Sequence, residues 1–163
     1  MSRLRCRARS HRETIAGAAI AAADAKPDFS GTWKLDPLRS RFNESLPAPK
    51  SLILTISHNE PKLHLELKLE SKEGERDLSF DLTTDGAEAK AAGSGDDCVA
   101  SAKWGDLDGT RLVLTIKQPG SNGTVVTNRV MKLGRNKNMI TTVLHVTGAK
   151  GTLKADEFFE REK

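Results

Sequence analysis

The sequence contains no tyrosine, and aromatic residues make up only 4% of its 163 residues. Proteins that bind nucleic acid usually combine a basic stripe with aromatic side chains for stacking. The net charge of +4 comes mainly from arginines in the first dozen residues. Basic and acidic residues nearly balance after Ala25. We therefore expect no nucleic-acid partner.

Cysteine is scarce and long apolar runs are missing. No run approaches the roughly 18 apolar residues of a membrane-spanning helix, so we expect no membrane span. The two cysteines are Cys6 and Cys98. With Cys6 near the N-terminus, Cys98 is alone in the rest of the chain, which excludes an internal disulfide there. We expect Cys98 to be a half-buried thiol on a strand.

The first 25 residues resemble a targeting segment. Five arginines precede the Ala-rich stretch Ile15–Ala23, and Ala23-Asp24-Ala25 has the A-x-A pattern of a cleavage site. This arrangement predicts a signal peptide over residues 1–25, a mature chain beginning at Lys26, and a secreted or periplasmic location. An amphipathic N-terminal helix or an organelle transit peptide is the alternative.

The rest of the chain has a period of two. Leu63, Leu65, Leu67 and Leu69 alternate with polar residues, which is typical of a strand with one dry face. Similar runs recur about every 10 to 12 residues, separated by turn-forming residues such as Asn122-Gly123. Because a dry face must be hidden, the strands pair with a second sheet or close on themselves.

We therefore predict an all-β fold, a single antiparallel up-and-down β-barrel of about eight to ten strands over residues 26–163. The least certain strand is Ala87 to Gly95. The irregular region is Asp36 to Lys50, which holds Pro37, Pro47 and Pro49. There we expect one short helix around Leu38 to Phe42, ended by the prolines.

One motif carries a family resemblance. The run Phe29-Ser30-Gly31-Thr32-Trp33 is similar to the F-x-G-x-W signature of lipocalins and fatty-acid-binding proteins, in the calycin superfamily. The continuation to Leu35 resembles the opening of the fatty-acid-binding branch. The resemblance implies a lipocalin-like exported bacterial barrel that carries a small, lipid-like molecule.

The resemblance also implies roles for individual residues. Gly31 would let the chain pass closely across the barrel floor, and Trp33 would plug that closed end. Arg161 would stack over Trp33. Arg129 matches an inward arginine that grips a ligand carboxylate in many fatty-acid-binding proteins. The Arg-x-Tyr pair of their last strand is replaced here by Glu157 and Phe159, which argues against fatty-acid recognition.

We expect reversible, non-catalytic binding of a small apolar or amphipathic molecule in the lumen, without a cofactor. Arg129 would be the polar anchor, paired with Glu157 in the empty barrel because a buried charge is costly alone. Fatty acids would then bind weakly. The expected lining is apolar: Leu52 or Ile53, Leu65, Leu67, Phe80, Leu114 and Phe159.

Two other classes of function remain open. The first is a protein-binding barrel, such as an exported enzyme inhibitor, with a lumen filled by side chains. The second is an enzyme with a histidine or Cys98 in the lumen, although no catalytic motif is present. His58 and His64 flank the turn Asn59-Glu60-Pro61 and are expected to face each other. Without a third ligand they make a weak metal site, so we expect no metal. The segments Asp96 to Cys98 and Asp106 to Asp108 match no metal pattern.

Overall fold

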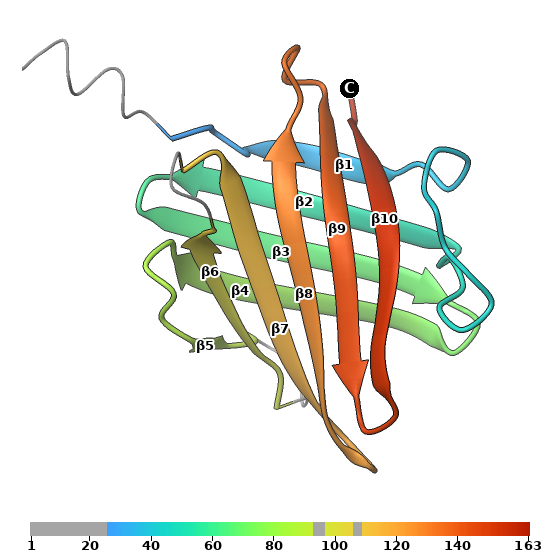
Figure 1. Ribbon diagram of the computed structural model, residues 1–163. Coiled ribbons are helices and arrows are strands. Elements are labelled where there is room, and N and C mark those ends of the chain that lie inside the picture. Colours follow the sequence, from blue (N-terminus) through green and yellow to red (C-terminus); the bar gives the residue numbers. More distant parts are fainter. Residues whose placement is uncertain (1–25, 93–96, 106–108) are drawn as a thin grey trace, which may run out of the picture.

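The computed structural model describes residues 26–92, 97–105 and 109–163 (Figure 1). Within them the fold is all-β, and no helix is present. Consequently no helix in this part of the chain could cross a membrane. The ten strands are β1 (Gly31–Leu35), β2 (Ser51–Asn59), β3 (Lys62–Ser71), β4 (Gly74–Thr83), β5 (Ala89–Lys90), β6 (Val99–Trp104), β7 (Arg111–Gly120), β8 (Gly123–Leu133), β9 (Met139–Gly148) and β10 (Gly151–Arg161).

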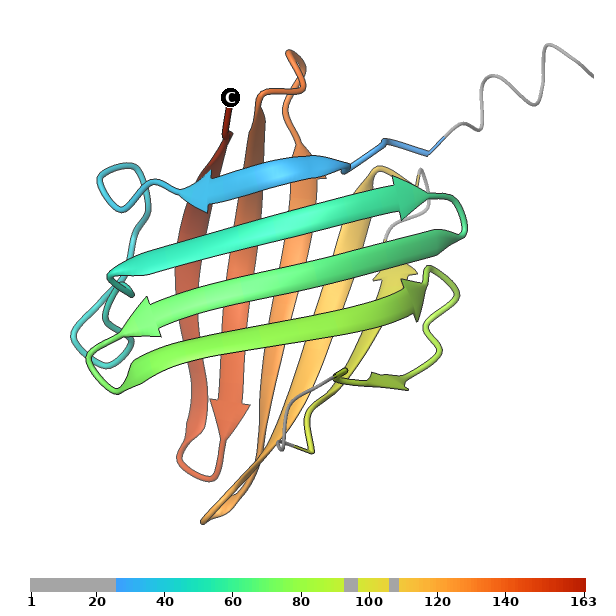
Figure 2. The same cartoon turned by 180° about the vertical axis from the view of Figure 1, so that it is seen from behind.

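The strands form one antiparallel up-and-down sheet that curls into a nearly closed barrel. Their order is β4-β3-β2-β1-β10-β9-β8-β7-β6-β5. The chain therefore follows a meander except where β1 meets β10. The layer β1–β4 crosses in front of β6–β10 at a steep angle, which gives a flattened barrel (Figure 2). The predicted fold class is confirmed.

The alternating leucines of β3 face the interior as predicted. Leu63, Leu65 and Leu67 are at most 6% exposed, and Leu69 packs against the same core. The strand register explains why this face excludes water, because Leu65 lies opposite Ile56 of β2 on one side and Phe80 of β4 on the other. Each strand thus contributes every second residue to one apolar core.

The segment between β1 and β2 forms no helix, which corrects the expectation for Leu38 to Phe42. Instead it runs along β10 as an irregular edge. Asp36 N donates to Phe158 O (2.8 Å), and Arg41 forms a β-bridge with Asp156. The physical reason is that β1 pairs with only three residues of β10. The rest of that edge needs hydrogen-bond partners, and the segment provides them.

The barrel is not sealed by a continuous ladder between its end strands, β4 and β5. Backbone contacts across this seam join Ser79 of β4 to the chain just after β5, and the chain just after β4 to β6. Ala92 N donates to Ser79 O (2.8 Å), Gly86 N donates to Ala102 O (2.9 Å), and Asp85 forms a bridge with Lys103. Of the uncertain Ala87 to Gly95 stretch, only β5 is a strand among the described residues.

Candidate functional site

One end of the barrel is closed by Trp33, which is fully buried. Its indole Nε1 donates to Phe29 O at 2.9 Å. The guanidinium of Arg161 lies 4.4 Å from the centroid of the ring and donates to Ser30 O at 2.8 Å. A cation over an indole face contributes ~0.5–2 kcal/mol. The predicted positions of Trp33 and Arg161 are therefore confirmed.

Gly31 has a φ of +144°, a conformation that side-chain-bearing residues rarely adopt. A Cβ at this position would collide with Nη1 of Arg161. The close contact at Gly31 is with the guanidinium that covers Trp33. The missing side chain of Gly31 leaves room for the guanidinium in this position.

A polar network beside the closed end was not anticipated from the sequence. His58 Nε2 lies 2.8 Å from Glu60 Oε2, and His58 Nδ1 accepts a bond from Phe29 N at 3.3 Å. Because Nδ1 is an acceptor, the ring proton lies on Nε2 and is donated to Glu60. Oε1 of Glu60 accepts from Trp104 Nε1 (3.2 Å) and from the Thr84 hydroxyl.

Glu60 connects three parts of the barrel. It lies in the β2–β3 turn, Thr84 follows β4, and Trp104 ends β6. Burial is the largest single influence on the pKa of Glu60 and raises it. The hydrogen bonds from Thr84, His58 and Trp104 outweigh burial, so the pKa lies below its ordinary value. The network therefore joins the ends of β4 and β6 beside the β4–β5 seam, where backbone pairing is sparse. The sequence does indicate that His58 points inward, because it continues the every-second-residue pattern of Leu52, Leu54 and Ile56.

Farther along the interior, Arg129 and Glu157 form the predicted pair. Arg129 Nε donates to Glu157 Oε1 at 2.9 Å, and Nη2 reaches Oε2 at 3.4 Å. Thr142 also donates its hydroxyl to Oε1 at 2.7 Å. The side chains of Arg129 and Glu157 are 11% and 1% exposed. The pairing is confirmed, and it occupies the guanidinium that a ligand carboxylate would need.

The expected lining residues lie in the packed core. Leu65, Leu67, Phe80, Leu114 and Phe159 are inward and 0–6% exposed. Leu52 points inward at 1% exposure, whereas the register places Ile53 on the outer face beside Lys34 and Lys68. Because these inward residues belong to one cluster, side chains fill the middle of the barrel. Open space is found at the ends and surfaces instead.

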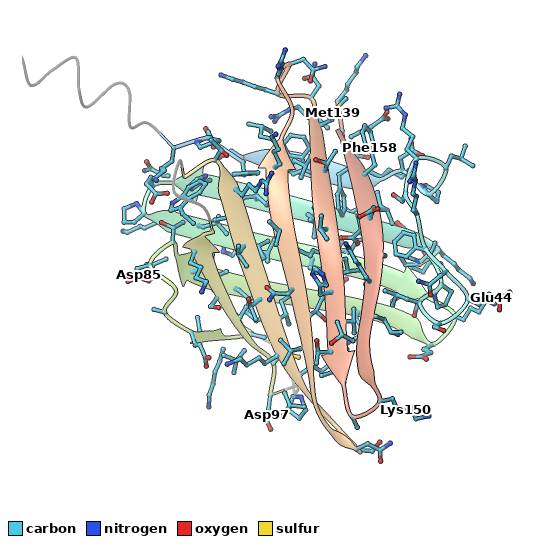
Figure 3. The ribbon with its side chains drawn as sticks, in the orientation of Figure 1. Glu44, Asp85, Asp97, Met139, Lys150 and Phe158 are labelled. Carbon is cyan, nitrogen blue, oxygen red and sulfur yellow. The ribbon has the colours of Figure 1, made fainter. Side chains whose placement is uncertain are left out.

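A hollow of about 540 Å³ lies at the end opposite Trp33. Val125, Val146 and Leu153 line it, together with the β7–β8 and β9–β10 turns and Ser45. Leu153 pairs directly with Val146 and is 36% exposed. Lys150 marks this end of β9 and Met139 the other (Figure 3). We call this hollow the mouth.

The mouth lies close to the buried ion pair. Thr127 of β8 pairs with Val146, and Arg129 is the next inward residue along the same strand. One inward step along a strand is about 7 Å. A molecule seated on Val146 and Leu153 would therefore lie one step from Arg129.

The histidines do not form the arrangement expected of them. His58 lies opposite Leu63 and points inward, whereas His64 lies opposite Ser57 and points outward. His58 and His64 therefore occupy opposite faces of the hairpin, which corrects the expectation that they face each other. His145 lies on the outer face of β9, opposite Asn128. No set of three metal-ligating side chains occurs in the part of the chain that the structure describes.

His64 interacts with carboxylates outside the barrel. Its Nδ1 is 2.6 Å from Asp81 Oδ1, and its Nε2 is 3.4 Å from Glu66 Oε1. The hydrogen bond to Asp81 is the main cause that raises the pKa of His64, and Glu66 adds to it. A histidine whose charged form is favoured in this way is a surface ion-pair partner.

Cys98 is fully buried rather than half-buried and directly precedes β6. Its Sγ accepts a hydrogen bond from Arg76 Nη2 at 3.7 Å. This corrects its expected exposure. The signal-peptide prediction for residues 1–25, Asp96, and the Asp106 to Asp108 segment lie outside the described residues.

Comparison with known proteins adds no relative: no family model and no curated protein matches the sequence. The nearly closed barrel is compatible with the calycin superfamily but does not identify it.

Proposed function

We propose that the protein reversibly binds a small apolar or weakly amphipathic molecule at the mouth and performs no chemistry on it. The observation that carries this proposal is the apolar hollow of Val125, Val146 and Leu153. Its volume of about 540 Å³ lies within the usual range for small-molecule sites. The binding position differs from the deep lumen expected from the sequence, because core side chains fill that space.

Apolar burial would supply the affinity. A ligand that buries about 400 Å² of apolar surface, counting both partners, gains ~10 kcal/mol. Association itself costs at least about 4 kcal/mol. The difference is at most about 6 kcal/mol, which corresponds to a dissociation constant no tighter than tens of micromolar. We therefore propose a carrier of moderate affinity rather than a tight storage protein.

The ion pair sets the selectivity of the proposed site. Glu157 already engages Arg129 through two contacts, and Thr142 supports that carboxylate. A fatty acid would have to displace Glu157 and leave it buried without its partner, which is costly. Neutral or cationic apolar ligands avoid this cost and should bind better.

A titration with a neutral fluorescent apolar probe and a fluorescent fatty acid tests the proposal. We expect the neutral probe to bind more tightly. Leu153→Ser should weaken its binding because the leucine lines the mouth. Leu38→Ser is the matched control, since Leu38 is 94% exposed and lies outside the hollow. Equal binding to both variants, or no binding to either, would contradict the proposal.

The packed middle of the barrel favours a second candidate, a protein-binding barrel such as an exported enzyme inhibitor. In this case the loops and outer faces would carry the contacts. Failure of every apolar probe in the titration would favour this candidate.

The location and family proposals rest on separate observations. We infer export to a secreted or periplasmic location from the Arg-rich leader and the Ala23-Asp24-Ala25 pattern. N-terminal sequencing of protein from its host should begin at Lys26. Membership of the calycin superfamily is supported by the Gly31, Trp33 and Arg161 arrangement at the closed end.

A further inference from the structure

The outer face of the β7–β10 layer carries a second hollow, away from the mouth. It has a volume of about 300 Å³, and four basic residues line it: Arg39, Arg41, Arg111 and Lys132. Figure 3 views this face, with Phe158 near its rim. We call this hollow the basic trough.

Register explains why a trough forms here. Lys132 of β8 lies opposite Thr141 of β9, and Thr141 lies opposite Phe158 of β10. One step along, Val130 lies opposite Val143. Short side chains on β9 thus form a recessed floor between longer side chains on its neighbours. The floor runs along β9 because Thr141 and Val143 are consecutive outward residues of that strand.

Positively charged side chains lie on both sides of this floor. Arg111 and Lys132 lie opposite each other on β7 and β8. On the other side, the segment after β1 brings Arg39 and Arg41 against β10. The backbone bridge to Asp156 holds Arg41 in place, and the Arg39 guanidinium lies 4.6 Å from the centroid of the Phe158 ring. Adjacent strands are about 4.8 Å apart, so the two rims are separated by roughly 14 Å.

Cationic residues outnumber the outward-facing carboxylates that line the trough. Asp156 is the carboxylate that lines it from the outer side, since Glu157 points inward to Arg129. Arg39 is partly neutralised by Glu160 at 3.2 Å and by Asp36 at 3.9 Å. Arg41 and Lys132 remain on opposite rims as positions that a negatively charged partner would meet. Charge complementarity therefore requires an anionic occupant.

We propose that the basic trough binds an extended acidic peptide segment of a partner protein. Successive side chains of an extended chain point in opposite directions. A peptide lying along β9 would therefore direct alternate carboxylates to the Arg111 and Lys132 rim and to the Arg39 and Arg41 rim. Its backbone would lie over Thr141, whose exposed hydroxyl can donate or accept a hydrogen bond.

Two other classes of partner fit the trough less well. A flat anionic bilayer reaches the long rim side chains but not the recessed floor of Val130 and Val143. Single-stranded nucleic acid binds by stacking on aromatic rings. In this trough Arg39 covers the Phe158 ring.

The test uses the full chain and a labelled, capped hexaglutamate peptide as the probe. We expect saturable binding that weakens as salt rises, and no binding of capped hexaglutamine. The double variant R41E/K132E should lose at least about tenfold in affinity because both rims become repulsive. The matched control is K62E/K68E, which makes the same charge change on the outer face of β3. It should stay within about twofold of the original protein. Circular dichroism on both variants checks that they fold.

Equal losses of affinity in both double variants would show that hexaglutamate binding depends only on the net charge of the protein, and would overturn the proposal. Absence of binding to the original protein would overturn it as well. So would preferential, R41E/K132E-sensitive binding of vesicles that contain phosphatidylglycerol. The proposal is independent of the mouth. Leu153→Ser should leave hexaglutamate binding unchanged, and R41E/K132E should leave neutral-probe binding unchanged.

Discussion

Arg161 lies over the indole ring of Trp33, 4.4 Å from its centroid, and the two residues are directly paired in the β1–β10 ladder. The first and last strands of the barrel thus meet at its plugged end. Hydrogen bonds from Arg161 to Ser30 O and Lys137 O hold the guanidinium in this position.

Trp33→Ala should destabilise the protein by ~3–5 kcal/mol, because it removes a fully buried large side chain from a packed core. Chemical denaturation monitored by circular dichroism measures the free energy of unfolding. Trp33→Phe is the control and should cost less, since it keeps an aromatic ring while losing the bond to Phe29 O. A loss below about 1 kcal/mol for Trp33→Ala would contradict its role as a plug.

Gly31→Ala should cost at least ~2 kcal/mol, from backbone strain at a φ of +144° and from collision with Arg161. In an Arg161→Ala background the collision is gone, so the same change should cost about 1 kcal/mol less. Unfolding free energies of the four proteins in this cycle provide the test. Strict additivity would mean that the guanidinium does not require the glycine.

Glu157→Leu should destabilise the barrel by ~3–5 kcal/mol, because it leaves Arg129 buried without its partner. The double variant Arg129→Met/Glu157→Leu should recover much of this loss, since neither charge then remains. Denaturation curves compare the two. Glu157→Gln should also tighten fatty-acid binding relative to the neutral probe, by freeing the guanidinium. An unchanged probe preference would show that Arg129 does not contact the ligand.

Glu60 should make the protein sensitive to acid. Its folded pKa lies below the ordinary value of 4.5, so its contribution to stability is fully present above that value. The contribution is lost as the pH falls through the lowered folded pKa. Stability measured against pH should therefore fall less steeply in this acid range for Glu60→Gln. Glu73→Gln, in the β3–β4 turn, should retain the original slope.

The contribution of His64 to stability should change with pH in the opposite direction to that of Glu60. Because Asp81 raises its folded pKa above 6.5, its stabilising contribution is complete below that value and disappears as the pH rises through the folded pKa. The effect on stability is small because the pair is exposed. Titration of the imidazole signals by NMR is the direct measurement. Asp81→Asn should lower the midpoint for His64, and an unaltered midpoint would exclude the interaction in solution.

The features that the sequence predicted well depend on the two-residue alternation of side chains along a strand. The leucines of β3 alternate with polar residues, and this alternation alone assigns their face. The positions of Trp33 and Arg161 and the pairing of Arg129 with Glu157 were implied by the resemblance to lipocalins and fatty-acid-binding proteins. Whether side chains fill the interior could not be predicted, since it depends on how closely the two layers approach. The alternation of residues along each strand does not determine the distance between the layers.

Other features depend on contacts between distant segments. No local pattern shows that β1 leaves most of the β10 edge open, and this open edge is why Arg41 bridges Asp156 instead of entering a helix. The same contact brings Arg41 to the trough that Arg111 lines. The histidine error was one of register. Once His58 lies opposite Leu63, His64 must lie opposite Ser57 and face outward.

The ladder between β1 and β10 also determines when during biosynthesis the barrel can be completed. Arg161 and Ser30, which bond across this junction, are 131 residues apart in the chain. The β2–β4 meander can assemble while the ribosome is still translating, but Trp33 cannot be covered until β10 has emerged. Until then the apolar indole stays exposed, and exposed apolar surface on an incomplete fold favours aggregation.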